Sequence, residues 1–161
     1  MLRINRYLVM VVLLLGLMSV VIGSVFIAQA LEKNNWMKSA MRVEKVTLGL
    51  SEEQIEKGEI VDTAEEAQIA GDTIREHRRN IAQTYDELLG EGPFDPTNPQ
   101  HLSYAQALNM ENYLYLAVLG FGVTRVILGA GVFMILTGIA LGATGVVLLR
   151  SSTKKAQASQ R

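Results

Sequence analysis

Apolar and polar residues in this chain are sorted into long blocks. Residues 7–28 (YLVMVVLLLGLMSVVIGSVFIA) are 22 positions without a charge. As a helix rising about 1.5 Å per residue, they cover about 33 Å, which matches a hydrocarbon core of about 30 Å. The pattern predicts a first transmembrane helix, which we place at residues 7–30.

The end of this block also allows a second interpretation. Ala28, Gln29 and Ala30 have the small-x-small form that signal peptidase accepts, so the segment is alternatively a signal peptide cleaved after Ala30. The apolar stretch is longer than the roughly 7 to 15 residues of an ordinary signal core. That length favours a retained transmembrane helix.

The second apolar block covers residues 113–149 and is interrupted only by Arg125. The block is longer than one membrane-spanning helix requires and shorter than two such helices joined by a turn require. A division at Arg125 leaves residues 126–149 as a second transmembrane helix and residues 113–125 as an apolar helix or bend at the outer interface. Arg125 then marks the outer edge, where its side chain reaches the headgroups. The alternative is a membrane-buried Arg125 paired with an acidic group of a partner subunit.

Charge indicates the direction of both spans. All 16 acidic residues and 8 of the 15 basic ones lie between Glu32 and Glu111, so this segment carries a net charge of −8. The other cations flank the apolar blocks, and positive charge favours the cytoplasmic side. We therefore expect a multi-pass protein of the cell membrane, with residues 1–6 and the basic tail 150–161 in the cytoplasm and the acidic residues 31–112 outside.

Helix signals occur throughout the acidic segment. Ser51 to Gln54 and Thr63 to Glu66 have the form of capping boxes, and the second predicts a helix that runs to about Leu89. Asn98 and Pro99 predict the start of the next helix. The expected packing stripe of the first helix is Ala67, Ala70, Ile74, His77, Ile81, Tyr85 and Leu88. That of the second is Leu102, Ala105, Leu108 or Asn109, Asn112, Tyr113 and Leu116.

These elements define the expected fold class. It is an all-α membrane protein in which two transmembrane helices form a hairpin, with an intervening helical extracytoplasmic bundle of about three to four helices. Gly120 and Gly122 offer a bend where the outer helix meets the second span.

Small residues recur along both predicted spans at helical spacing. Small side chains let helix backbones approach closely in lipid, so we expect the two stripes to pack on each other, with a second copy of the chain as the alternative partner. The predicted packing residues are Gly16, Ser19, Gly23, Gly131, Gly138, Gly142 and Gly145.

Three arginines on one helix form the most suggestive polar patch. Arg75, Arg78 and Arg79 lie on one side of the predicted helix and together suit a carboxylate, a phosphate headgroup or an acidic partner. The competing interpretation is a solvated helix face, or pairing with local carboxylates such as Asp72 and Glu76. His77, on the packing stripe, and Arg125 complete the predicted contact residues.

The sequence offers no recognisable catalytic or cofactor chemistry. The absence of cysteine excludes disulfides and thiolate chemistry, and neither histidine has the Glu-x-x-His spacing of a helical metal site. We therefore expect no metal and no cofactor, although His77, His101, Glu76 and Glu111 would meet if two helices packed antiparallel. The acidic segment also lacks the basic surface that binds nucleic acid.

The combined pattern predicts a non-catalytic membrane protein. We expect an accessory or scaffolding subunit that meets the lipid bilayer and docks another membrane or envelope protein, or itself, through its extracytoplasmic helices. The alternative is a membrane-embedded enzyme or transport component that binds an anionic ligand near the outer interface. A homo-oligomeric membrane sensor is the third option, weakened by cytoplasmic ends too short for an output domain.

Overall fold

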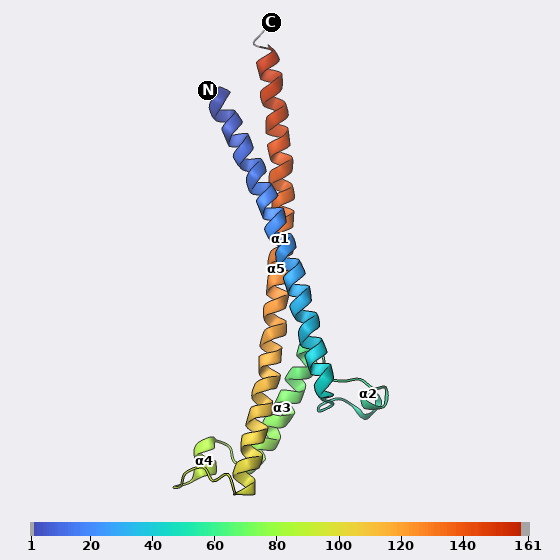
Figure 1. The fold of residues 1–161 in the computed structure, drawn as a ribbon, viewed down its shortest axis with the longest axis vertical. Helices are drawn as coiled ribbons and strands as arrows, with labels where there is room; N and C mark the ends of the chain where they lie inside the picture. The colour runs from blue at the N-terminus through green and yellow to red at the C-terminus, as the bar shows by residue number, and fades with distance from the viewer. Residues whose placement is uncertain (1, 159–161) are drawn as a thin grey trace. The chain divides into compact units, whose positions relative to one another are not determined.

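The computed structural model describes the backbone of residues 2–158 and the side chains of residues 7–151. Every regular element in this range is a helix, which confirms the all-α prediction (Figure 1). The five helices are α1 (Leu2–Glu44), α2 (Glu52–Glu56), α3 (Ala64–Ile81), α4 (Tyr85–Leu89) and α5 (Pro99–Ala158).

Two helices are far longer than the others. α1 has 43 residues and α5 has 60, and α5 passes Gly120, Gly122 and Arg125 without a break, so the expected bend does not interrupt it. α1 ends at Glu44, where Lys45 takes a positive φ of 49°. By length and composition, each of these two helices is apolar and long enough to cross a membrane.

The predicted helix starts are confirmed. The Ser51 and Thr63 side chains each accept a hydrogen bond from the backbone N–H three residues on, and Gln54 and Glu66 complete the two capping boxes. At the start of α5, the Asn98 side chain accepts the N–H of Gln100 at 2.9 Å. These caps satisfy backbone groups that a helix start leaves unpaired.

The predicted extent of α3 is wrong. The helix ends at Ile81, Ala82 is extended, and Thr84 caps the separate helix α4. The Thr84 hydroxyl accepts the N–H of Glu87 at 3.1 Å, while the Glu87 carboxylate accepts the N–H of Gln83 at 2.8 Å. These local bonds give the backbone an alternative to continuing the helix, which explains the interruption.

The chain forms two compact units, each containing part of both long helices. The first consists of Met1–Glu32 and Arg125–Arg161, and the second of Lys33–Thr124. The boundaries therefore fall inside α1 and α5.

The first unit is a helix pair with small residues between its helices. On α1 the buried positions recur every seven residues, and on α5 three buried glycines do the same. A Cβ added to Gly16 would lie 2.9 Å from the Gly138 carbonyl oxygen, and one added to Gly23 would lie 2.6 Å from that of Gly131. These buried residues are Val9, Gly16, Gly23 and Ala30 on α1, and Gly131, Gly138 and Gly145 on α5.

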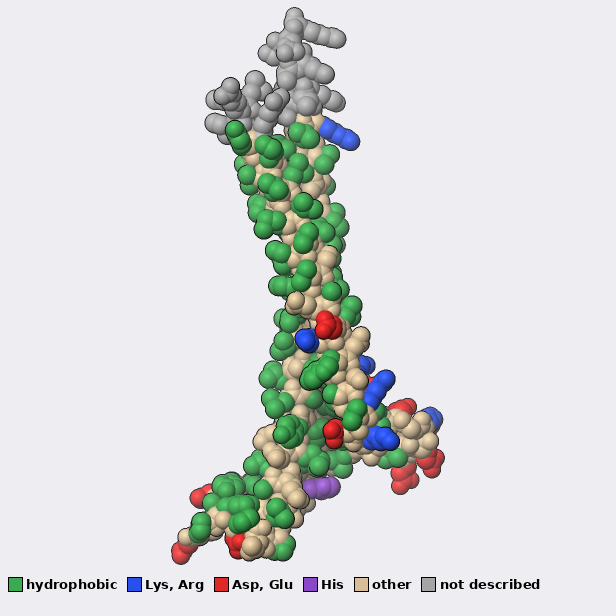
Figure 2. All heavy atoms as spheres, in the orientation of Figure 1, with side chains coloured by type: hydrophobic (Ala, Val, Ile, Leu, Met, Phe, Trp, Pro, Cys, Tyr) green, Lys and Arg blue, Asp and Glu red, His purple; other side chains and the backbone are tan. Residues whose placement is uncertain are grey.

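The large apolar side chains of this unit face outward. Leu14, Leu17 and Phe133 are 58%, 62% and 69% exposed. On the face drawn in Figure 2, hydrophobic side chains cover both helices of the unit. The arrangement reverses that of a water-soluble helix pair, which buries Leu and Val at the seam and exposes charges.

The second unit has a small core built on α3. Val61, Ala67, Ala70 and Leu114 are buried together, and Met41 and Ile74 are among the partly buried residues packed on them. Gly71 lets α3 approach α5, because a Cβ there would lie 3.0 Å from Cε1 of Tyr115. Ala67 and Ala70 are buried, which confirms their predicted place in the packing stripe. Ile81 and Tyr85, predicted for the same stripe, are instead 37% and 46% exposed.

The packing stripe predicted for α5 is wrong by about one position. Leu102, Tyr113 and Leu116 are 45%, 67% and 60% exposed. The buried residues are Tyr104, Glu111, Leu114, Phe121 and Thr124. The prediction followed hydrophobicity, but a tyrosine and a glutamate occupy the inner face because α3 presents arginines to them.

Candidate functional site

Arg75 and Arg78 of α3 share one carboxylate of α5. Glu111 accepts a hydrogen bond from Nε of Arg78 at 2.8 Å through Oε2, and from Nε of Arg75 at 3.2 Å through Oε1. Arg78 is only 8% exposed and Glu111 only 7%. The arrangement is a buried ion-paired bridge between α3 and α5.

Two tyrosines of α5 complete this bridge. Arg78 donates to the Tyr104 hydroxyl and Arg75 to the Tyr115 hydroxyl. The guanidinium carbons lie 4.8 Å and 4.7 Å from the respective ring centroids. Each guanidinium therefore lies over a tyrosine ring and also donates a hydrogen bond to the hydroxyl of the same tyrosine.

The charges in this cluster balance. Asp72 lies 3.2 Å from Arg75 and accepts the Tyr115 hydroxyl at 2.6 Å, so two carboxylates face two guanidiniums. The hydrogen bond to Glu111 raises the pKa of Arg78 above its usual value, against the opposing effect of burial. Arg78 therefore stays charged, and the cluster presents no unpaired cation to a ligand.

The other predicted contact residues lie apart from this bridge. Arg79 and Arg125 are exposed, and neither side chain has a hydrogen bond or ion pair within the described part of the chain. His77 is also exposed, so its predicted place in the packing stripe is wrong; Arg78 occupies the buried position instead. The structure thus brings Arg75 and Arg78 together and leaves Arg79 and His77 facing solvent.

The second histidine has a local role. Nδ1 of His101 accepts the backbone N–H of Asp95 at 3.0 Å, and the imidazole lies 5.5 Å from the ring of Phe94. Two hydrogen bonds from Thr97 lower the pKa of the Asp95 carboxyl. His101 therefore orders the turn before α5, and no group of three or more metal-ligating side chains occurs among the described residues.

The predicted small residues lie at the helix contact of the first unit, including Gly142, whose backbone nitrogen lies 3.0 Å from the Cβ position of Gly16. The Ser19 hydroxyl donates to the backbone oxygen of Met134 at 2.7 Å, and Gly145 faces Leu13. A Cβ at Gly142 would meet nothing within 4 Å. Gly16, Gly23, Gly131 and Gly138 make the close backbone contacts.

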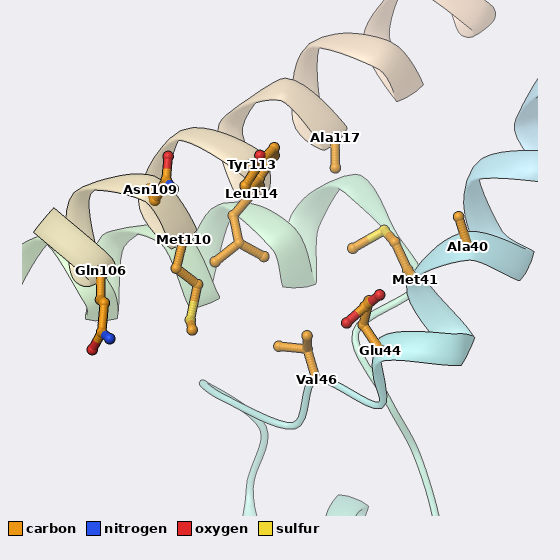
Figure 3. Close-up of a pocket in the computed structure, with 10 residues that line it drawn as sticks. All are labelled: Ala40, Met41, Glu44, Val46, Gln106, Asn109, Met110, Tyr113, Leu114 and Ala117. Atoms are coloured by element: carbon orange, nitrogen blue, oxygen red, sulfur yellow. The ribbon is translucent and has the colours of Figure 1, made fainter.

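The structure also contains a groove that the sequence did not reveal. It lies between the end of α1 and α5, has a volume of about 730 Å³, and is lined mainly by apolar side chains (Figure 3). Its lining residues come from positions far apart in the sequence, so no local pattern marks them.

Comparison with protein-family models, with curated proteins and with solved structures finds no match to this chain.

Proposed function

We propose that the chain is a two-span membrane protein that docks a partner membrane or envelope protein through its second unit. The first unit supports the membrane placement, because its helices bury glycine and alanine and expose leucine, valine and phenylalanine. Such a surface is unfavourable in water and suits lipid tails, where small residues drive close helix packing.

Charge supports the orientation. The second unit contains 15 acidic and 8 basic residues, a net charge of −7, whereas Arg3, Arg6, Lys154 and Lys155 flank the apolar blocks at the two chain ends. Arg3, Arg6, Lys154 and Lys155 lie outside the residues whose side chains are described. Under the positive-inside rule, both ends are cytoplasmic and the second unit is outside.

The docking role rests on one observation, the exposed apolar surface of the second unit. Trp36, Tyr113 and Leu119 are 67%, 67% and 63% exposed. Covering such large exposed apolar side chains with a partner is favourable in free energy, because it removes their apolar area from water. Arg79, the arginine that Glu111 does not bind, adds a charged contact of the kind that selects a partner.

Photo-crosslinking from two positions tests this role. A photoreactive phenylalanine analogue replaces Leu116, on the apolar surface, or Glu52, on α2, in the full-length chain, and native membranes are irradiated. We expect Leu116 to yield one covalent adduct with a second protein and Glu52 to yield none. Adducts only between copies of this chain, or no adduct at Leu116, would contradict docking of a partner.

A further inference from the structure

The groove of the second unit has an apolar wall with a single charge. α5 contributes Met110, Leu114 and Ala117, and α1 contributes Ala40 and Met41. Val46 closes the lower side in Figure 3, where Met110, Leu114 and Met41 point toward the same space. Methionine side chains adapt to irregular apolar partners, so this wall suits an apolar side-chain row.

Of the described residues that line the groove, only Glu44 is charged. It is exposed, points toward the groove in Figure 3, and forms no ion pair within the described part of the chain. Arg42, the basic residue of the last turn of α1, is instead bound to Asp62 at 2.8 Å. The groove therefore offers an uncompensated carboxylate.

The position of Glu44 in its helix strengthens its attraction for a cation. It is the last residue of α1, where the unpaired carbonyl groups of the final turn carry partial negative charge. A carboxylate at this end of a helix is unfavourable, whereas a cation there is stabilised by both the carboxylate and the carbonyl groups. A lysine or arginine of a partner supplies that charge.

The length of the groove indicates what kind of partner fits. Its α5 wall runs from Gln106 to Ala117, about three helical turns or roughly 17 Å. Gln106 and Asn109 place amide groups along the edge. An amphipathic helix of similar length fits an apolar groove with a polar rim.

We infer that this groove binds an amphipathic helix of the partner, with apolar residues on Met41, Met110 and Leu114 and one lysine or arginine on Glu44. This inference rests on the proposed docking function and assigns the partner's chemistry. A second copy of the chain is disfavoured as the occupant, because each second unit carries a net charge of −7 and would bring like charges together.

Defined peptides test the charge preference. The full-length chain in zwitterionic lipid nanodiscs is titrated with fluorescent, helix-stapled 14-residue peptides that have a leucine face and one central lysine or, in the matched peptide, glutamate. Anisotropy is corrected with protein-free nanodiscs. We expect the lysine peptide to bind about fivefold more tightly than the glutamate peptide, as for a partly exposed ion pair.

Variants assign the preference to one residue. Glu44→Gln should abolish it and Glu44→Lys should reverse it, while Glu56→Gln, which removes an exposed carboxylate of α2, should leave it unchanged. No binding of either peptide, equal binding of both, or a lysine preference that survives Glu44→Gln would overturn the inference.

The two proposals fail in different ways. An adduct between Leu116 and a second protein, combined with no charge preference in the peptide titration, would overturn the groove assignment and leave partner docking standing. A photoreactive group at Asn109 adds a direct check, because it should join the groove to a helix of the partner. Its capture of the same groove in another copy of the chain would overturn the inference in favour of self-association.

Discussion

Among single residues, Glu111 is the buried carboxylate that two arginines of the second unit share. One carboxylate accepts hydrogen bonds from two arginines and thereby joins α3 to α5. Burying ions costs several kcal/mol each, and the attraction between them offsets that cost only while every partner is present. The bridge should therefore be sensitive to the loss of its acidic member.

Glu111→Gln should destabilise the second unit by about 3–5 kcal/mol, because it leaves the buried guanidinium of Arg78 without a carboxylate, while Arg75 keeps only Asp72. The Arg78 guanidinium stays protonated without Glu111, so its charge remains buried in the variant. In the native protein, the hydrogen bond to Glu111 raises the pKa of Arg78. A group with a raised folded-state pKa stabilises at lower pH and loses its contribution only above that pKa, so the effect should persist across neutral pH.

Hydrogen exchange in α3 measures this change. For Glu111→Gln we expect exchange from Ala64–Ile81 to accelerate by about two to three orders of magnitude, since about 1.4 kcal/mol corresponds to a factor of ten. The matched control is Glu76→Gln, which removes an exposed carboxylate of α3. Equal protection in the two variants would show that the bridge contributes nothing to stability.

Only the arginine side of this bridge could be predicted from the amino-acid pattern. Three arginines at helical spacing were visible in the pattern, and so was pairing with nearby carboxylates such as Asp72. Glu111 lies 33 residues from Arg78, so its role depends on which face of α5 packs against α3. That face could not be identified from hydrophobicity, because it includes Tyr104 and Glu111, while the apolar Leu116 faces outward.

At the level of helices, close backbone contact in the first unit explains why glycines recur every seven residues. A repeat of seven keeps one stripe in contact with a partner helix along its length. Gly23 and Gly131 are so close that a methyl group on either would lie within 2.8 Å of the other's carbonyl oxygen. Side-chain rotation cannot move these two oxygens away, because they belong to the backbone.

Gly23→Ala should therefore weaken the α1–α5 contact by about 1–3 kcal/mol, the usual cost of overpacking. Gly129→Ala is the matched control, since a Cβ there meets nothing within 4 Å and alanine favours helix. Reversible unfolding in mixed lipid and detergent micelles gives both free energies. A Gly23→Ala protein as stable as the Gly129→Ala protein would rule out this close contact.

Helix starts were easier to predict than helix ends. Ser51, Thr63 and Asn98 have short-range signals that the structure confirms. The break after Ile81 had a signal of the same kind, because Thr84 and Glu87 have capping-box spacing, but the continuing apolar period hid it. Local hydrogen bonding prevailed over periodicity because Ile81 and Tyr85 have no core to enter.

At the level of the whole molecule, the proposed docking depends on which side of a membrane each part of the chain occupies. The two long apolar helices, the outward-facing apolar side chains of the first unit and the acidic charge of the second support one arrangement. In that arrangement both helices remain in the mature protein and the second unit is outside. Partner docking, and the groove that receives the partner, require it.

Single-cysteine labelling tests this arrangement most directly, because the chain contains no cysteine of its own. Ser103→Cys and Ser151→Cys place thiols at two exposed positions of α5, and Asn5→Cys adds one before the first apolar block. Intact cells are treated with a membrane-impermeant maleimide, and the mass of the intact chain is measured by mass spectrometry.

We expect labelling of Cys at position 103 in intact cells, and of positions 5 and 151 only after permeabilisation, each on a chain of full-length mass. Labelling at position 151 from outside, or protection at position 103, would contradict the proposed topology. A chain that has lost position 5 together with the mass of residues 1–30 would show that the first helix is cleaved and would leave a single span.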